Sequence, residues 1–397
     1  MTGFDTLLTN GVLPDGRRTD IALAGGRIAA IGVPADAVAR ESFDLHGDLV
    51  LPGLVDGHMH LDKTLVGLPW LPHPAAPFRM SRIEADKRVL PGLPLSTEAR
   101  AVNLARQCVA HGTAHIRTHV DIDLEGKLTK LEGVLAAREK LAGSVTIQIV
   151  AFPQSGVMRC PGVLDLLDAA MRSGADLVGG IDPLEIDRDP KGQLDGIFAL
   201  AEKHGRGLDI HLHEPGEMGL FNVQEICARS LALGLQGKVT ISHGFCLGGI
   251  AESKQQATAE LMARAGVMLV THGAGSATFP PIMLLRRAGV TVFAGNDDVR
   301  DTWSPYGNGD MLERLSFIGW RADLRHDPLI HEVFELGSSA GARALGRGDY
   351  GLAIGCAADL VTSPASGIPE AVGAHAPRRL VFHGGKLVAR DGAYCGT

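Results

Sequence analysis

The chain has 397 residues, 45% hydrophobic, 21% charged and 5% aromatic, which suits a folded α/β protein and excludes a disordered one. Its formal charge of −7 is spread without a basic block, which excludes the electrostatic footprint of a nucleic-acid or anionic-membrane binder and favours a small-molecule partner. None of the six cysteines forms a Cys-x-x-Cys pair, so neither a disulfide framework nor a thiolate metal site is expected. The first residues lack a signal-peptide pattern and no apolar run reaches membrane-spanning length, so a cytoplasmic protein is expected.

Both ends of the chain carry short β-like stretches separated by turn signals. They lie at 6–10, 20–24 and 27–31, and again at 358–362, 379–382 and 386–389. We expect residues 1–50 and 350–397 to form one small β-sandwich domain together, because chain ends often lie near each other on the surface of a fold. Residues 51–349 then remain as the catalytic body.

That middle part alternates short apolar strands with amphipathic helical stretches, which is typical of a parallel α/β fold. Eight strands are expected, at 49–55, 115–119, 146–152, 176–181, 208–213, 238–243, 267–271 and 290–295. Helices are expected between them, for example at 97–111, 128–141, 162–173, 194–204 and 257–265. Eight such units predict a TIM-like (β/α)8 barrel, with all strand carboxyl ends on one face. The irregular segment 67–94, rich in Pro and Gly, is expected to cover that face.

The first barrel strand runs into His58 and His60. Residues two apart on a strand share a face, so two imidazoles at a strand's carboxyl end are well placed to hold one metal ion. The alternative is a pair of ordinary loop histidines. If the pair binds a metal, other strands must end in further ligands.

Several other strands do end in polar residues. These are His119, Gln154, His211, His213, Glu214, His243, Asn296, Asp297 and Asp298. Taken alone, Asp297 and Asp298 could begin a helix as its N-cap and first-turn acids. Taken together, the strand ends predict three histidines and one aspartate that converge on a catalytic metal site with room for water.

The same stretches resemble the amidohydrolase superfamily and, within it, the cytosine deaminase family. The motifs that carry the resemblance are Gly-His-Met-His-Leu-Asp (57–62), Ile-Arg-Thr-His-Val-Asp (116–121), Ile-Gln-Ile-Val-Ala-Phe-Pro-Gln (147–154), Asp-Ile-His-Leu-His-Glu (209–214), Ser-His (242–243) and Asn-Asp-Asp-Val-Arg-Asp-Thr-Trp (296–303). The His-x-His start is widely shared in the superfamily, whereas the Phe-Pro-Gln and Asp-Asp-Val elements are more restricted.

The resemblance implies a role for each matching residue. The ligands of one divalent metal, Zn²⁺ or Fe²⁺, would be His58, His60, His211 and Asp297. The catalytic groups would be His243 and Asp297, which orient and deprotonate water, and Glu214, the proton shuttle. Gln154 would bind the substrate's amide edge, Asp298 and Trp303 would line its pocket, and His213 would be a spectator. The fourth strand ends in Ile181-Asp182-Pro183, without the carboxylated lysine of binuclear relatives such as dihydropyrimidinase-like enzymes, so a single metal is implied.

Three departures from the cytosine deaminase pattern lie near the expected substrate. Lys63 stands where those enzymes carry a small hydroxyl residue, although relatives that hydrolyse isopropylammelide also carry lysine there. Asn296 replaces a histidine, and the stretch 272–281 is short and dissimilar. Lys63 is therefore either a substrate contact or a solvated loop lysine.

The function implied is a metal-dependent hydrolytic deaminase of a cytosine-like nitrogen heterocycle. Such a metal lowers the pKa of its water towards about 7, which supplies a nucleophile at neutral pH. The alternatives are hydrolysis of an N-alkylaminotriazine of the isopropylammelide type, opening of a cyclic amide, and a non-catalytic scaffold barrel. The small-molecule heterocycle is the partner expected, and the sequence is compatible with a homo-oligomer.

Overall fold

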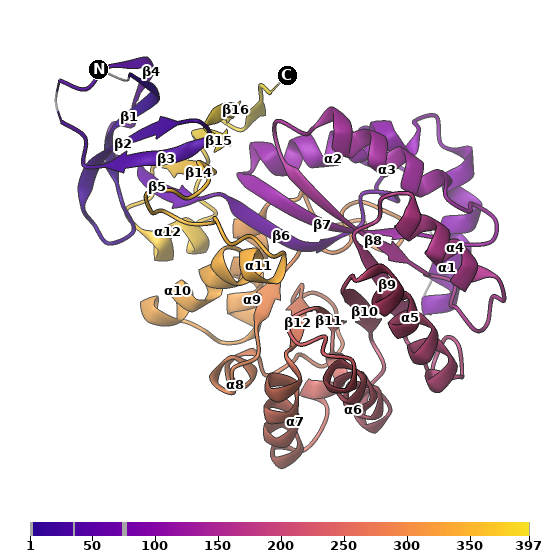
Figure 1. Ribbon diagram of the computed structural model, residues 1–397. Coiled ribbons are helices and arrows are strands. Elements are labelled where there is room, and N and C mark those ends of the chain that lie inside the picture. The colour runs from indigo at the N-terminus through magenta and orange to yellow at the C-terminus, as the bar shows by residue number, and fades with distance from the viewer. Residues whose placement is uncertain (1–2, 35, 74–77, 397) are drawn as a thin grey trace.

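Figure 1 shows the computed structural model, which describes residues 3–34, 36–73 and 78–396. A parallel barrel with helices packed around it forms the larger part, and a mixed sheet from both chain ends lies beside it. The two ends of the chain lie on this smaller sheet, as expected from the sequence.

The smaller sheet has nine strands in the order β17-β16-β15-β14-β5-β1-β2-β3, with β4 paired to β1. The strands are β1 (Phe4–Val12), β2 (Arg18–Ala24), β3 (Arg27–Ile31), β4 (Ala39–Asp44), β5 (Leu49–Pro52), β14 (Leu360–Ser363), β15 (Leu380–His383), β16 (Lys386–Arg390) and β17 (Ala393–Tyr394). The antiparallel pairing of β14 with β5 joins the two ends of the chain into one sheet. Its own apolar core includes Leu8, Leu23, Val50 and Phe382.

The barrel has eight parallel strands in chain order, as predicted. They are β6 (Leu54–Met59), β7 (Thr113–Asp121), β8 (Thr146–Phe152), β9 (Leu177–Ile181), β10 (Leu208–Leu212), β11 (Val239–His243), β12 (Val267–Thr271) and β13 (Val292–Ala294). A parallel bridge between Met59 and Asp297 links the last strand region to the first, so the barrel is nearly closed. All carboxyl ends therefore meet at one mouth.

Helices cover the outside of the barrel in Figure 1. The described helices are α1 (Arg79–Val89), α2 (Thr97–Ala110), α3 (Thr129–Lys140), α4 (Val163–Arg172), α5 (Pro190–His204), α6 (Gly216–Ala232), α7 (Glu252–Ala265), α8 (Ile282–Arg287), α9 (Met311–Arg321), α10 (Asp327–Leu336), α11 (Ser339–Ala344) and α12 (Ile368–Gly373), with 3₁₀ turns at Leu90–Gly92 and Phe245–Gly248. Local signals begin several of them: Ser96 caps α2, and Asp189 followed by Pro190 begins α5. No described helix is both long and apolar enough to cross a membrane.

One predicted strand, 49–55, is two strands in the structure. β5 belongs to the small sheet and β6 to the barrel, and the chain changes sheet at Gly53. A Cβ at this position would lie 2.6 Å from the side chain of Ala114, so the crossing requires glycine. Apolar residues on both sides of Pro52-Gly53 make the two strands resemble one, because both are buried, and the Pro-Gly pair marks the break.

Helix α1 lies within the irregular segment 67–94, of which residues 74–77 lie outside the described residues. Arg79, at its start, forms ion pairs with Glu185 and with Asp182, 3.4 Å away. Lys87, in its last turn, pairs with Glu125 at 3.2 Å. Because these acids follow the carboxyl ends of β7 and β9, α1 lies at the barrel mouth, as the sequence predicts for this segment.

Candidate active site

Five histidines from four strands meet at the barrel mouth. His58 lies on β6 with His60 just after it, His119 is on β7, His211 on β10 and His243 ends β11. The ring of His58 has its centre 5.4 Å from that of His60, 4.7 Å from His211 and 5.0 Å from His243. All five side chains are buried. The predicted convergence of strand ends therefore occurs, and it includes His119, 4.2 Å from His58.

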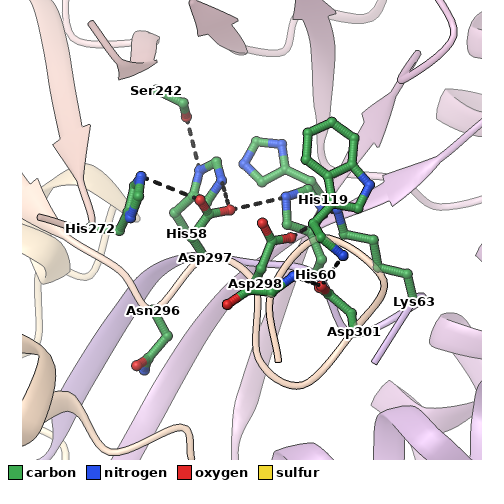
Figure 2. Close-up of polar contacts among 12 residues, drawn as sticks. His58, His60, Lys63, His119, Ser242, His272, Asn296, Asp297, Asp298 and Asp301 are labelled. Atoms are coloured by element: carbon green, nitrogen blue, oxygen red, sulfur yellow. Dashed lines mark hydrogen bonds and ion pairs between the residues drawn. The ribbon is translucent and has the colours of Figure 1, made fainter. Parts of the chain in front are cut away.

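Asp297 faces this cluster from the loop after β13 (Figure 2). Its Oδ1 lies 3.2 Å from Nε2 of His58 and 3.3 Å from Nε2 of His60. Its backbone N–H donates to the carbonyl of His58 at 2.8 Å. This approach requires Gly295, where a Cβ would lie 2.4 Å from the backbone nitrogen of His58. The interpretation of Asp297 as a helix N-cap is wrong, since the next helix begins at Met311.

The hydrogen bonds of Ser242 determine which nitrogen of His58 carries a proton. Ser242 Oγ donates to Oδ1 of Asp209 at 2.6 Å and also lies 2.9 Å from Nδ1 of His58 (Figure 2). A carboxylate only accepts, so the single hydroxyl proton goes to Asp209 and Nδ1–H of His58 donates to the hydroxyl. The lone pair of a neutral His58 is then on Nε2, directed at Asp297. Two electron-rich atoms at this distance are stabilised by a cation between them.

The other rings also offer free electron pairs. Both ring nitrogens of His211 and of His243 are buried without a hydrogen-bond partner among the described residues. Burial lowers the pKa of both imidazoles well below its usual value, so they are neutral, the form that binds metals. Ligands about 2.0–2.1 Å from a tetrahedral zinc are about 3.3 Å apart, close to the observed spacing of Asp297 from His58 and His60. These residues fit one divalent cation.

Two further histidines line the site, and neither has an assigned catalytic role in the sequence interpretation. His272, directly after β12, has its Nε2 3.5 Å from Oδ2 of Asp297, and burial lowers its pKa to about 4. His213, expected to be a spectator, stacks on His243 with ring centres 4.3 Å apart. Its Nδ1 lies 2.7 Å from Oδ2 of Asp182. The rule that polar residues at strand ends are informative would have found His272 too.

Glu214 follows His211 by three residues and is fully buried. Its Oε1 accepts from the backbone N–H groups of Leu184 at 2.7 Å and Glu185 at 2.8 Å, and its Oε2 accepts from the side chain of Asn222. Burial raises the pKa of this carboxyl group. Three donors thus fix its orientation, and one of the about four acceptor positions of a carboxylate is left.

A second group of side chains lies beside these histidines and Asp297. It contains the residues predicted to bind the substrate. Lys63 is buried, with its Nζ 2.9 Å from Oδ1 of Asp298, 3.4 Å from Oε1 of Gln154 and 4.4 Å from the ring centre of Trp303. The alternative that Lys63 is a solvated loop lysine is therefore wrong. Asn296, by contrast, turns towards Asp56 and donates to it at 2.7 Å.

Three carboxyl groups surround Lys63 in this second group. Burial alone would lower the pKa of Lys63, but Asp298, Asp301 and Asp86 raise it above its usual value. Burial, and then the carboxylate of Asp298, raise the pKa of Asp301 well above its usual value, so Asp301 is the protonated partner. Lys63 is thus a fixed cation in contact with Asp298 and Trp303.

A cavity of about 630 Å³ opens onto both groups, and its lining includes Arg82, His272, Asp297, Asp298, Trp303 and Phe317. Ligand sites commonly have about 300–1,000 Å³. The cavity therefore has room for one heterocycle and a small substituent.

Comparisons with known proteins agree with this site. The profile of the Amidohydrolase family matches residues 41–389. N-isopropylammelide isopropyl amidohydrolase of Pseudomonas sp. strain ADP is 30% identical over 398 residues, 98% of each chain. The crystal structure of N-isopropylammelide isopropylaminohydrolase from Burkholderia multivorans is 45% identical, with a TM-score of 0.95 over 98% of this chain and 99% of that one.

A 5-methylcytosine deaminase from Klebsiella pneumoniae, liganded with 5-fluorocytosine, is 25% identical, with a TM-score of 0.87 over 97% of each chain. The superfamily expected from the motifs is thus confirmed, although this cytosine-type relative is less similar than the isopropylammelide enzymes. With its buried histidine and aspartate cluster, the chain belongs to the amidohydrolase family, as a metal-dependent hydrolase of non-peptide carbon–nitrogen bonds.

Proposed function

We propose that the protein hydrolyses the bond between a triazine ring carbon and an exocyclic alkylamino nitrogen, on a ring that also carries oxo groups. The two isopropylammelide hydrolases support this choice over the cytosine-like substrate that the motifs first suggested. The observation that carries the proposal is Lys63, a buried cation in contact with Asp298 and Trp303, which line the cavity.

Lys63 favours a ring rich in acceptor oxygens. Its ammonium has three N–H donors, and Asp298 and Gln154 account for two acceptors. The third N–H has no oxygen acceptor among the described residues, and we infer that it serves a ligand oxygen beside the ring of Trp303, which the ammonium also contacts. A cytosine ring has one carbonyl oxygen, whereas an ammelide-type ring has two oxo groups and forms an anion more readily.

The reaction adds the oxygen of water to the ring carbon and breaks the bond to the exocyclic nitrogen, so that a free alkylamine leaves and the ring gains an oxo group. When bound, one divalent cation, Zn²⁺ or Fe²⁺, at His58, His60, His211 and Asp297 would supply a strong nucleophile from water at neutral pH. His243 and Asp297 would hold this water and take its proton. Glu214, with its raised pKa, would deliver a proton to the ring nitrogen and then to the leaving amine.

A cytosine-like ring remains the second candidate, because the 5-methylcytosine deaminase matches over nearly the whole chain. Gln154, which can both donate and accept, suits the amide edge of either ring. The two candidates differ in the leaving group, which is an alkylamine in one case and ammonia in the other.

The test is a screen of metal-loaded protein against N-isopropylammelide, other N-alkylaminotriazines, cytosine, 5-methylcytosine, isoguanine and creatinine, scored by release of amine or ammonia. We expect kcat/KM for an N-alkylaminotriazine to exceed that for cytosine by at least about 10-fold, or about 1.4 kcal/mol of transition-state stabilisation. The opposite order would replace the proposal by the second candidate.

Replacing Lys63 by methionine should reduce hydrolysis of dioxo rings far more than hydrolysis of cytosine-like rings. A hydrogen bond from a charged group contributes about 1.5–3 kcal/mol, so kcat/KM for the dioxo ring should fall by about 10- to 100-fold. Lys191→Met, at an exposed lysine on α5, is the control and should leave kcat/KM unchanged for both substrates. Equal losses on both rings at full metal content would show that Lys63 does not select the substrate.

A further inference from the structure

Asp86, on the helix at the barrel mouth, binds two of the predicted substrate residues at once. It lies on α1 and is 1% exposed. Its Oδ2 accepts from Nε2 of Gln154 and from Nε1 of Trp303, each at 2.8 Å. One carboxylate oxygen thus connects the residue expected to bind the ring edge with the residue expected to line the ring face.

These two bonds fix the orientation of Gln154. The indole Nε1–H of Trp303 can only donate, so Oδ2 of Asp86 is an acceptor, and the same oxygen accepts from Nε2 of Gln154. The amide of Gln154 must therefore turn its NH₂ towards Asp86. Its Oε1 is then left on the other side, 3.4 Å from Nζ of Lys63.

Asp86 and Lys63 also hold Trp303 from two directions. The indole donates in its plane to Asp86, while Nζ of Lys63 lies 4.4 Å from the ring centre. In-plane and out-of-plane contacts together leave the ring little freedom to rotate. Burial raises the pKa of Asp86, and the positive charge of Lys63 opposes this rise.

We propose that Asp86 is the positioning residue that decides which edge of a substrate ring the pocket accepts. It acts through Gln154, whose donor and acceptor it holds in a fixed order, and through the fixed plane of Trp303. A ring with the reverse order of donor and acceptor is rejected. This inference rests on the proposed function, because it assigns a role within the same pocket.

Helix α1 keeps this carboxylate in place by contacts at both of its ends. Arg79 pairs with Asp182 at 3.4 Å at one end, and Lys87 with Glu125 at 3.2 Å at the other. Asp86 therefore has a fixed position even though it lies outside the barrel strands. The competing role for Asp86 is that of a simple counter-ion for Lys63, which would depend on its charge alone.

The test is a double-mutant cycle between Asp86→Ala and Gln154→Ala, with kcat and KM measured on an alkylaminotriazine and on cytosine. Asp86→Ala should lower kcat/KM on the better substrate by about 10- to 100-fold, as expected for two lost buried hydrogen bonds, and narrow the preference between rings. In the Gln154→Ala background the same change removes only the hydrogen bond to Trp303, so it should lower kcat/KM by a clearly smaller factor than in the wild-type background. If Asp86→Ala lowers kcat/KM by the same factor with and without Gln154, the proposal is overturned.

Asp86→Asn separates positioning from charge. The amide oxygen of asparagine can still accept from both donors, so this variant should retain ring preference and most of the activity. Glu84→Ala removes an exposed carboxylate from the same helix and should behave as wild type. If Asp86→Asn is as damaging as Asp86→Ala, charge is what matters and the positioning role is wrong.

A second readout does not depend on any substrate. The emission of Trp303 is obtained by subtracting the spectrum of the same protein with Trp303→Phe. This difference spectrum should change in Asp86→Ala and stay unchanged in Glu84→Ala. No change in Asp86→Ala would overturn the inference. A wild-type protein that hydrolyses none of the rings would instead refute the proposed function, whatever the fluorescence shows.

Discussion

Asp297→Asn is expected to lose the metal and, with it, more than about 100-fold in kcat/KM, because even partners that only support metal ligands can cost 10- to 100-fold. The carboxylate oxygen of Asp297 lies 3.2 Å from Nε2 of His58 and 3.3 Å from Nε2 of His60. An amide there offers a neutral oxygen of much lower affinity for a divalent cation. Metal content by elemental analysis and turnover are the two measurements.

Asp298→Asn is the matched control, since it removes the adjacent carboxylate. Asp298 turns the other way and pairs with Lys63 at 2.9 Å (Figure 2). This variant should keep its metal and lose activity only through weaker binding of substrate. Equal metal loss in both variants would contradict the assignment of Asp297 as the ligand.

The stoichiometry tests the prediction of a single metal. His243, His272 and Asp297 form another group whose ligand atoms all lie within 4.8 Å of one another. If the site is mononuclear, wild-type protein contains one ion per chain and His272→Ala retains it. Two ions per chain, falling to one in His272→Ala, would show that this group holds a second metal.

The rule that parallel strands end on one face explains why the sequence alone brings most of the candidate site together. His58, His211 and His243 are far apart along the chain, yet each lies on a barrel strand near its carboxyl end. Eight apolar stretches separated by helices allow few arrangements, so the polar residues that end them must meet. His272 lies directly after β12 and obeys the same rule, although from the sequence it was considered only as part of the stretch 272–281.

Residues outside the strands follow no comparable rule. Asp86 lies on a helix within an irregular segment, and no periodic pattern connects it with Gln154, 68 positions later. Lys63 could have been solvated, because a loop position alone does not determine burial. The change of sheet at Gly53 depends on contact with Ala114, which only the folded structure reveals.

The comparison with isopropylammelide hydrolases also shows where motif resemblance is least specific. The metal-binding motifs follow from chemistry that many relatives share, so they indicate a hydrolase but do not identify the ring that it acts on. The neighbourhood of Lys63, with Asp298 and Gln154 in contact, is where the sequence departs from the cytosine deaminase pattern. The assignment of a substrate therefore depends on the pocket side chains more than on the cluster of histidines and Asp297.

Glu214→Gln is expected to retain the metal and to lose at least about 100-fold in turnover, the low end for a general acid–base group. The substitution should fold normally because the site can accept an amide. The new oxygen can take the two backbone N–H groups that Oε1 of Glu214 accepts now, at 2.7 and 2.8 Å. Asn222 can rotate its amide and accept from the new NH₂, since its Oδ1 has no hydrogen-bond partner among the described residues.

Asn222→Ala is the matched control for positioning as opposed to proton transfer. It removes one donor to Glu214 while leaving the carboxyl group, so its loss of turnover should be well below that of Glu214→Gln. Metal loss in Glu214→Gln would show that Glu214 is a ligand, and unchanged turnover would show that its buried hydrogen bonds serve the fold alone. If Glu214 transfers the proton, the pH dependence of kcat should also lose the limb set by its raised pKa in Glu214→Gln and keep it in Asn222→Ala.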